Sequence, residues 1–100
     1  MKEIKEGNSV IVYLQNPREK IWGVLISLDE RGVMLRGGNL ESIQMFLENP
    51  EKEVESLFST FFFPSHRIEK ILLDEGSKGT SSIEEMILDK LKKPLEEILQ

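Results

Sequence analysis

Three consecutive phenylalanines at positions 61–63 limit the folds open to this chain more than any other feature. Their surroundings, Leu57–Phe63, favour a β-strand, and successive side chains on a strand point to opposite faces. Phe61 and Phe63 therefore share one face, and Phe62 points to the other. A strand with aromatic side chains on both faces needs an apolar cover on both, or it invites pairing with another chain.

Four other segments show the residue types of short β-strands, with turn residues such as Asn16-Pro17 between them. Gly23, inside the second of these segments, marks a bend or a close approach of two backbones, and Gly37-Gly38 ends the third. Five short strands with one glycine bend predict a small, strongly coiled β-barrel. The four segments are Ser9–Leu14, Ile21–Leu28, Val33–Arg36 and Ile68–Leu73.

Residues 39–49 change to helical spacing. Leu40, Ile43 and Leu47 fall on one face of a helix, and Asn39 is a favourable N-cap. This pattern predicts a helix, and an extended strand followed by a loop is the competing interpretation.

A second apolar stripe at helical spacing lies near the end of the chain. Ser81 or Ser82 is its expected N-cap, with Glu84 and Glu85 as capping-box partners. Pro94 lies inside the stripe, so we expect a kink or a short break there.

The chain has 100 residues, which is enough for one domain and too few for two. The pattern divides it into a β-barrel over residues 1–76, with an insertion at about 39–56, a linker over 77–81 and a C-terminal helix over 82–100. The domain class is therefore mainly β, with a helical appendage and a helical or loop insertion.

Composition indicates a globular protein of the cytoplasm. The chain is 39% hydrophobic and 31% charged, and it has no cysteine and no apolar run long enough to span a bilayer. We find no secretory signal and expect no membrane partner. The net charge of −5 argues against non-specific nucleic-acid binding, and we expect no DNA partner. The acidity is concentrated in residues 39–60, where one lysine faces five glutamates.

The segment Gly23–Gly37, G-V-L-I-S-L-D-E-R-G-V-M-L-R-G, resembles the first signature of the Sm-like family, nearest to its bacterial Hfq-type branch. Val10–Asn16 is similar to the first strand of the family and its asparagine turn. Pro64–Ile71 is similar to the shorter second signature, where a tight turn joins strands four and five. The resemblance covers residues 8–74 and implies a five-stranded, strongly bent Sm-like (SH3-like) barrel.

The resemblance also implies that identical copies form a homo-oligomeric ring. In Sm-like rings, strand four of one copy pairs with strand five of the next. Such a ring would place Leu57–Phe63 against residues 68–73 of a neighbour. The competing interpretation is that the helix at 39–49 or the C-terminal helix covers Phe62 within one chain. The interface residues that the resemblance implies are Phe61, Phe62, Phe63, Ile68 and Ile71.

A third implication is RNA binding by turns that face the pore of the ring. The residues that correspond to these turns are Asp29, Arg31, Ser65, His66 and Arg67. Local roles compete with this one: the Asp29 carboxylate can accept hydrogen bonds from the backbone of residues 31 and 32. The His66 ring can likewise cap its corner, and an exposed Arg31 is usually only solvated.

The remaining motifs do not support catalysis. Ser65 and His66 are adjacent, so they do not easily adopt the geometry of a nucleophile and its base, and Gly76–Ser82 lacks the spacing of a phosphate-binding loop. Tyr13 and Trp22 can stack on bases, although aromatic side chains on barrel strands more often pack in a core. We expect no enzyme activity, no cofactor and no metal site. The sequence predicts an RNA-binding ring, and a protein–protein interaction ring without RNA is the alternative.

Overall fold

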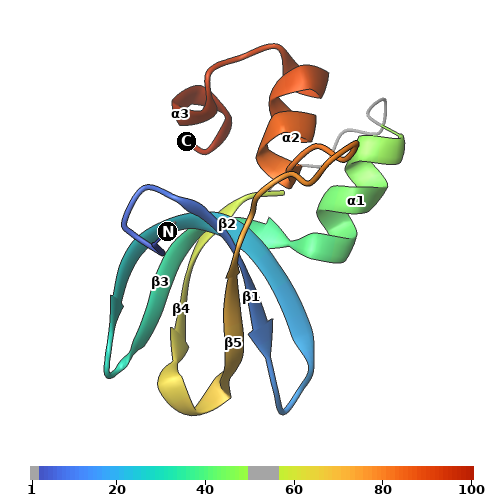
Figure 1. The fold of residues 1–100 in the computed structure, drawn as a ribbon. Helices are drawn as coiled ribbons and strands as arrows, with labels where there is room; N and C mark the ends of the chain where they lie inside the picture. The colour runs from blue at the N-terminus through green and yellow to red at the C-terminus, as the bar shows by residue number, and fades with distance from the viewer. Residues whose placement is uncertain (1–2, 50–56) are drawn as a thin grey trace.

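The computed structural model describes residues 3–49 and 57–100 (Figure 1). The strands form one five-stranded antiparallel sheet in the order β4-β3-β2-β1-β5, so the predicted mainly-β class is confirmed. In chain order the elements are β1 (Ser9–Leu14), β2 (Glu19–Asp29), β3 (Gly32–Asn39), α1 (Leu40–Glu48), β4 (Ser59–Pro64), the 3₁₀ helix η1 (Ser65–Arg67), β5 (Ile68–Leu73), α2 (Ile83–Leu91) and α3 (Leu95–Ile98).

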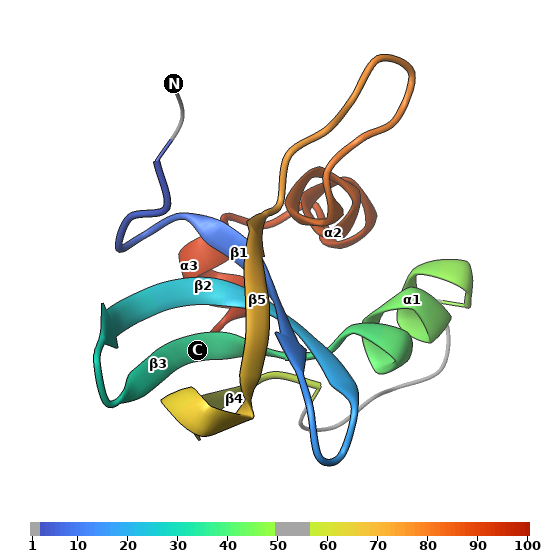
Figure 2. The same ribbon diagram turned by 60° about the horizontal axis from the view of Figure 1, so that its bottom comes forward.

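The sheet is curled but not closed. Within the described residues β4 pairs only with β3 and β5 only with β1, so β4 and β5 are the two edges. The helix η1 links these edges at one end, and Figure 2 shows the two strands leaving η1 in different directions. The structure therefore has an open, curled sheet where the sequence predicts a barrel.

Gly23 of β2 is the register partner of Gly37 of β3, and neither position leaves room for a side chain. A Cβ atom at Gly23 would lie 2.7 Å from a Leu35 methyl carbon, and one at Gly37 would collide with the Trp22 carbonyl oxygen. The close approach predicted at Gly23 is thus confirmed. Gly37-Gly38 does not end the strand, however: β3 continues to Asn39, because glycine lets neighbouring backbone lie directly against it.

The inner face of the sheet encloses one apolar core. Strict alternation along β5 predicts that Ile68 and Leu72 share a face, but Ile68 packs against this core and Leu72 is exposed. A register shift places Ile68 opposite Leu14, which turns Ile68 inward. The buried residues of the inner core are Val10, Val12, Leu14, Ile21, Leu25, Val33, Leu35 and Phe63.

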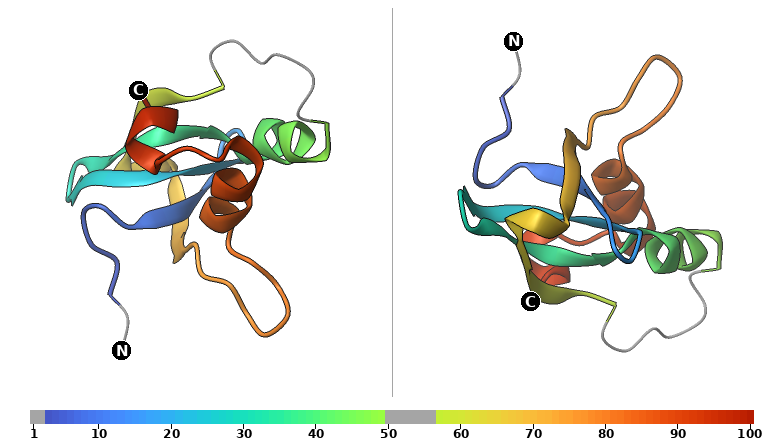
Figure 3. Two further views of the ribbon diagram at one scale, coloured as in Figure 1. Left: turned by 90° about the horizontal axis from the view of Figure 1, so that it is seen from above. Right: turned by 90° about the horizontal axis from the view of Figure 1, so that it is seen from below.

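A second core lies on the outer face of the sheet, under the helices. It is centred on Trp22, Leu40, Ile43 and Ile87, and apolar residues of all three helices contribute to it. Figure 1 shows α2 and α3 above the strands, and Figure 3 shows α1 to one side of them. Arg36 of β3 donates a hydrogen bond to the Leu99 carbonyl oxygen, which holds the C-terminal segment on this face.

The N-caps predicted from the sequence are confirmed. Residues 40–48 are helical, and the Asn39 side chain accepts a hydrogen bond from the Ser42 N–H group. The hydroxyl of Ser82 accepts from the Glu85 N–H group, so Ser82 is the N-cap, and it donates to the Glu85 carboxylate. The Glu85 carboxylate thus bonds the Ser82 hydroxyl and not the backbone N–H group that it bonds in a capping box. The predicted C-terminal helix at 82–100 is two helices, α2 and α3, separated by the short break expected at Pro94. The acidic residues at 51–55 lie outside the described residues.

Asp74, just after β5, joins the sheet to α2. Its Oδ2 atom accepts hydrogen bonds from the indole N–H of Trp22 and from the backbone of Glu84, each at 2.8 Å. Its Oδ1 atom accepts from the backbone of Ile83 at 2.8 Å. One carboxylate thus caps the N-terminus of α2 and accepts the hydrogen bond of the fully buried Trp22 indole.

Replacement of Asp74 by alanine should lower the free energy of unfolding by about 2–3 kcal/mol, because it removes a helix cap and leaves the Trp22 N–H without a partner. Urea unfolding followed by circular dichroism measures the loss. The control is Asp89→Ala on α2, where the exposed carboxylate pairs with Lys92; its effect should stay within about 0.5 kcal/mol. Equal losses for the two variants would contradict this role of Asp74.

Candidate functional site at the turn end of the sheet

Three turns lie on the side of the sheet away from α2 and α3, with η1 between the other two, and we call this region the turn end (Figures 1 and 2). They are the β1–β2 turn at residues 15–18, the β2–β3 turn at 30–31, and η1. The Ser65 N–H group donates a 2.8 Å hydrogen bond to the Arg31 carbonyl oxygen, which ties η1 to the β2–β3 turn. The structure therefore brings the five predicted RNA-binding positions to one end of the molecule.

Asp29 shapes the β2–β3 turn from within. Its Oδ1 atom accepts a 2.8 Å hydrogen bond from the Arg31 N–H group, and its Oδ2 atom lies 3.3 Å from Arg31 Nη2. The hydrogen bond from the Arg31 backbone, followed by the one from the Arg31 side chain, lowers the pKa of Asp29. The hydrogen bond predicted between the Asp29 carboxylate and the backbone of residue 31 is thus observed. The Arg31 side chain remains 83% exposed.

Arg67 holds the β1–β2 turn against η1. Its Nε atom donates to the Gln15 carbonyl oxygen at 3.0 Å, and its Nη2 atom donates to the Pro17 carbonyl oxygen at 2.8 Å and to the Glu19 carboxylate at 3.2 Å. The side chain is only 21% exposed. Most of the guanidinium is therefore occupied inside the chain, which reduces its capacity to bind phosphate.

Ser65 and His66 are exposed at the tip of the turn end. The His66 carbonyl oxygen accepts a 3.1 Å hydrogen bond from the Gln15 side chain. The imidazole ring forms no hydrogen bond or ion pair with the described part of the chain, so the capping role considered for it is not observed. Together with Arg31, His66 is a side chain that this end presents to solvent.

The phenylalanines of β4 lie as their alternation predicts. The rings of Phe61 and Phe63 are stacked with centroids 5.5 Å apart, and both pack against the inner core. Phe62 points away from them and is 52% exposed, so the helices do not bury it. Ile68 and Ile71 of β5 are half-buried against the inner core. Of the five residues expected at an interface, Phe62 is the one whose side chain is free to meet another chain.

The two aromatic residues considered for base stacking lie in different environments. Trp22 is fully buried and bound to Asp74, so it cannot stack on a base. Tyr13 lies between Lys20 and Lys70, two candidate residues that the sequence reasoning missed. Tyr13 and Lys20 are equally far from the Asn16-Pro17 turn in the sequence. This equal spacing predicts that they pair across the hairpin, as they do.

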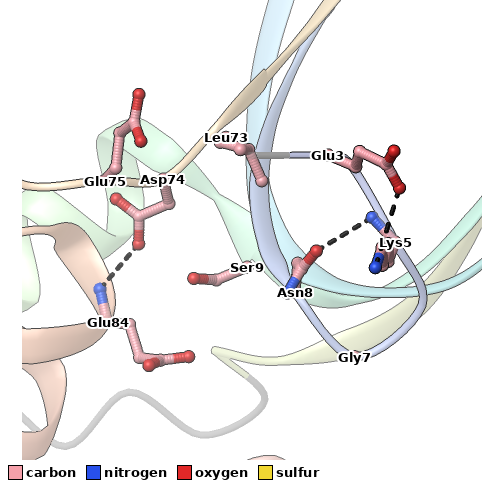
Figure 4. A pocket seen from close by; sticks show the side chains of 9 residues that line it. All are labelled: Glu3, Lys5, Gly7, Asn8, Ser9, Leu73, Asp74, Glu75 and Glu84. Carbon is pink, nitrogen blue, oxygen red and sulfur yellow. Dashed lines mark hydrogen bonds and ion pairs between the residues drawn. The ribbon is translucent and has the colours of Figure 1, made fainter. Parts of the chain in front are cut away.

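A hollow of about 450 Å³ between the N-terminal segment and α2 is rich in carboxylates (Figure 4). Asp74 accepts a hydrogen bond from the backbone of Glu84 there, and Lys5 pairs with Glu3. Over residues 3–49 and 57–100, no group of three or more His, Cys, Asp or Glu residues is placed to hold a metal ion. The hollow therefore gives no basis for a metal site.

Comparisons of the chain with family models, with curated proteins and with solved structures find no match. None of the helices in the described ranges is long and apolar enough to cross a membrane. The functional argument therefore rests on the geometry of the turn end and of the sheet edges.

The charge of Asp29 should stabilise the fold in a pH-dependent way. The variant Asp29→Asn tests this, because asparagine removes the charge and keeps an acceptor for the Arg31 N–H group. Since the native pKa of Asp29 is lowered, its stabilisation is present above the ordinary aspartate pKa of about 3.9 and is lost as the pH falls through the native value. The wild-type Tm should exceed that of the variant near pH 7, and the difference should vanish in acid.

An Arg31→Ala background provides the control for this measurement. The backbone N–H group of residue 31 remains there, so most of the Asp29→Asn effect should persist. A Tm difference that does not change with pH would show that the charge of Asp29 is not what stabilises the turn.

Proposed function

We propose that the chain is an Sm-like protein that assembles from identical copies into a ring and binds RNA at its turn end. The observation that carries the proposal is that the sheet has two open edges, and both of them display large apolar side chains. Phe62 on β4 is 52% exposed and Leu72 on β5 is 41% exposed. In Sm-like rings the fourth and fifth strands join neighbouring copies, and these are the same two strands that form the edges here.

Pairing between the two edges has a clear physical basis. Each edge strand has a row of backbone groups that no other strand engages within the described residues, and such rows favour the addition of a strand from another chain. The two edges differ, so each copy can pair β4 with the β5 of the next, and a suitable rotation closes the ring. Burial of Phe62 in this contact would contribute about 1–2 kcal/mol per copy.

The RNA part of the proposal is supported by the exposed groups at the turn end. The Arg31 guanidinium can form paired hydrogen bonds with a phosphate, and the exposed His66 ring lies on the neighbouring turn. In a ring each contact is repeated in every copy, so weak single contacts add to a useful affinity.

A ring that binds proteins and not RNA is the second candidate. It is favoured by the intramolecular partners of the turn-end arginines: Asp29 neutralises Arg31, and Gln15, Pro17 and Glu19 occupy Arg67. The net charge of −5 points the same way, because acidic surfaces repel the RNA backbone.

Light scattering tests the assembly. We expect a mass that is a multiple of the 11.5 kDa chain, and Phe62→Glu should shift it toward the monomer by placing a charge at the β4 edge. Met45→Glu is the matched control, because Met45 is 62% exposed and belongs to α1, not to β4 or β5. A monomeric wild type, or an unchanged mass for Phe62→Glu, would contradict the ring.

Binding of short single-stranded RNA at several salt concentrations tests the second part. The double variant Arg31→Ala/His66→Ala should weaken binding about tenfold, which corresponds to about 1.4 kcal/mol, whereas Lys90→Ala on α2 should not. Arg67→Ala is a poor probe, since it also removes the contacts that hold the β1–β2 turn. Absence of binding even at low salt would favour the protein-binding ring.

A further inference from the structure

A groove of about 620 Å³ opens between the β1–β2 hairpin, β5 and the start of α1. Figure 1 shows α1 beside the strands of this hairpin. Tyr13 contributes an aromatic ring to the groove, and Gln44 contributes an amide from α1. The charged residues that line it are Arg18, Glu19, Lys20, Glu41, Glu69 and Lys70.

The sheet register places two lysines on either side of Tyr13. Lys20 of β2 and Lys70 of β5 are both register partners of Tyr13, so the three side chains form a row across neighbouring strands on the outer face. The ammonium nitrogen of Lys20 lies 5.1 Å from the centroid of the tyrosine ring, and that of Lys70 lies 4.6 Å from it. Both are within the range of a cation–π contact.

The positive charges that line the groove are not neutralised by ion pairs within the described residues. Across the described ranges, Arg18, Lys20 and Lys70 have no carboxylate within ion-pair distance. The Glu19 carboxylate, which also lines the groove, is paired with Arg67. Glu41 and Glu69 are the remaining carboxylates of the lining, against three cations. Two ammonium groups held against one ring repel each other, and a bound anion would relieve that repulsion.

We propose that this groove binds a nucleoside phosphate, either as a free nucleotide or as a unit of an RNA chain, and the RNA form rests on the proposed function. Lys20 and Lys70 swing from the ring to the phosphate on their flexible stems. The ring of Tyr13 is then free to stack on the base. The site is separate from Arg31 and His66, so the two RNA contacts can be tested independently.

The test uses the full chain and two probes: a fluorescently labelled hexanucleotide RNA, followed by anisotropy, and adenosine monophosphate, followed by calorimetry. Lys20→Gln/Lys70→Gln should weaken RNA binding at least tenfold. It should also reduce the slope of log affinity against log salt by about 1.4, the value for two lost phosphate contacts on a single strand. Tyr13→Leu should weaken binding and leave the slope unchanged. The matched control is Lys90→Gln/Lys93→Gln, two exposed lysines in the last turn of α2 and in the break after it, which should alter neither quantity.

The outcomes separate the two sources of the ligand and the two proposals. Binding of adenosine monophosphate that is lost in Lys20→Gln/Lys70→Gln supports a free nucleotide, and the same loss with RNA alone supports an RNA chain. RNA binding that depends on Arg31 and His66 but not on the lysines overturns this inference and leaves the proposed function intact. A wild type that binds neither probe at low salt overturns the inference, whereas a mass above the monomer would still support the ring.

Discussion

The hydrogen bonds of the Asp74 carboxylate connect the two layers of this protein. The carboxylate accepts hydrogen bonds from the buried indole of Trp22, at the centre of the sheet, and from the first N–H groups of α2. A buried indole N–H without a partner is costly, so the end of β5, the middle of β2 and the start of α2 are held together. The start of α2 is thereby held over the outer face of the sheet, and the β2–β3 turn and η1, away from it, remain uncovered.

Local signals in the sequence predict much of this fold. The bounds of Ser9–Leu14 and Ile68–Leu73 follow from apolar runs between turn residues, and the helix after Asn39 follows from its cap and its spacing. The opposite orientations of Phe62 and its two neighbours follow from the geometry of a strand alone. By contrast, the inward orientation of Ile68 depends on a register shift against β1, which no local pattern records.

The candidate site is less predictable for the same reason. The resemblance places five residues on two turns, and the structure brings these turns together. The resemblance does not reveal that Arg67 donates hydrogen bonds to the β1–β2 turn, about fifty residues away in sequence. Nor does it reveal that Lys70 lies beside Tyr13. Such contacts arise from strand pairing across the sheet, so they become visible only when the order and register of the strands are known.

The placement of the turn end away from α2 and α3 has a consequence for any closed assembly of this chain. Rotational symmetry keeps equivalent atoms at the same height along the axis. A ring with a single rotation axis would therefore have two unlike faces, and turns that face its pore would leave the C-terminal helices farther from the axis. A ligand that approached along the axis would meet a different surface from each direction, so the particle would have an intrinsic polarity.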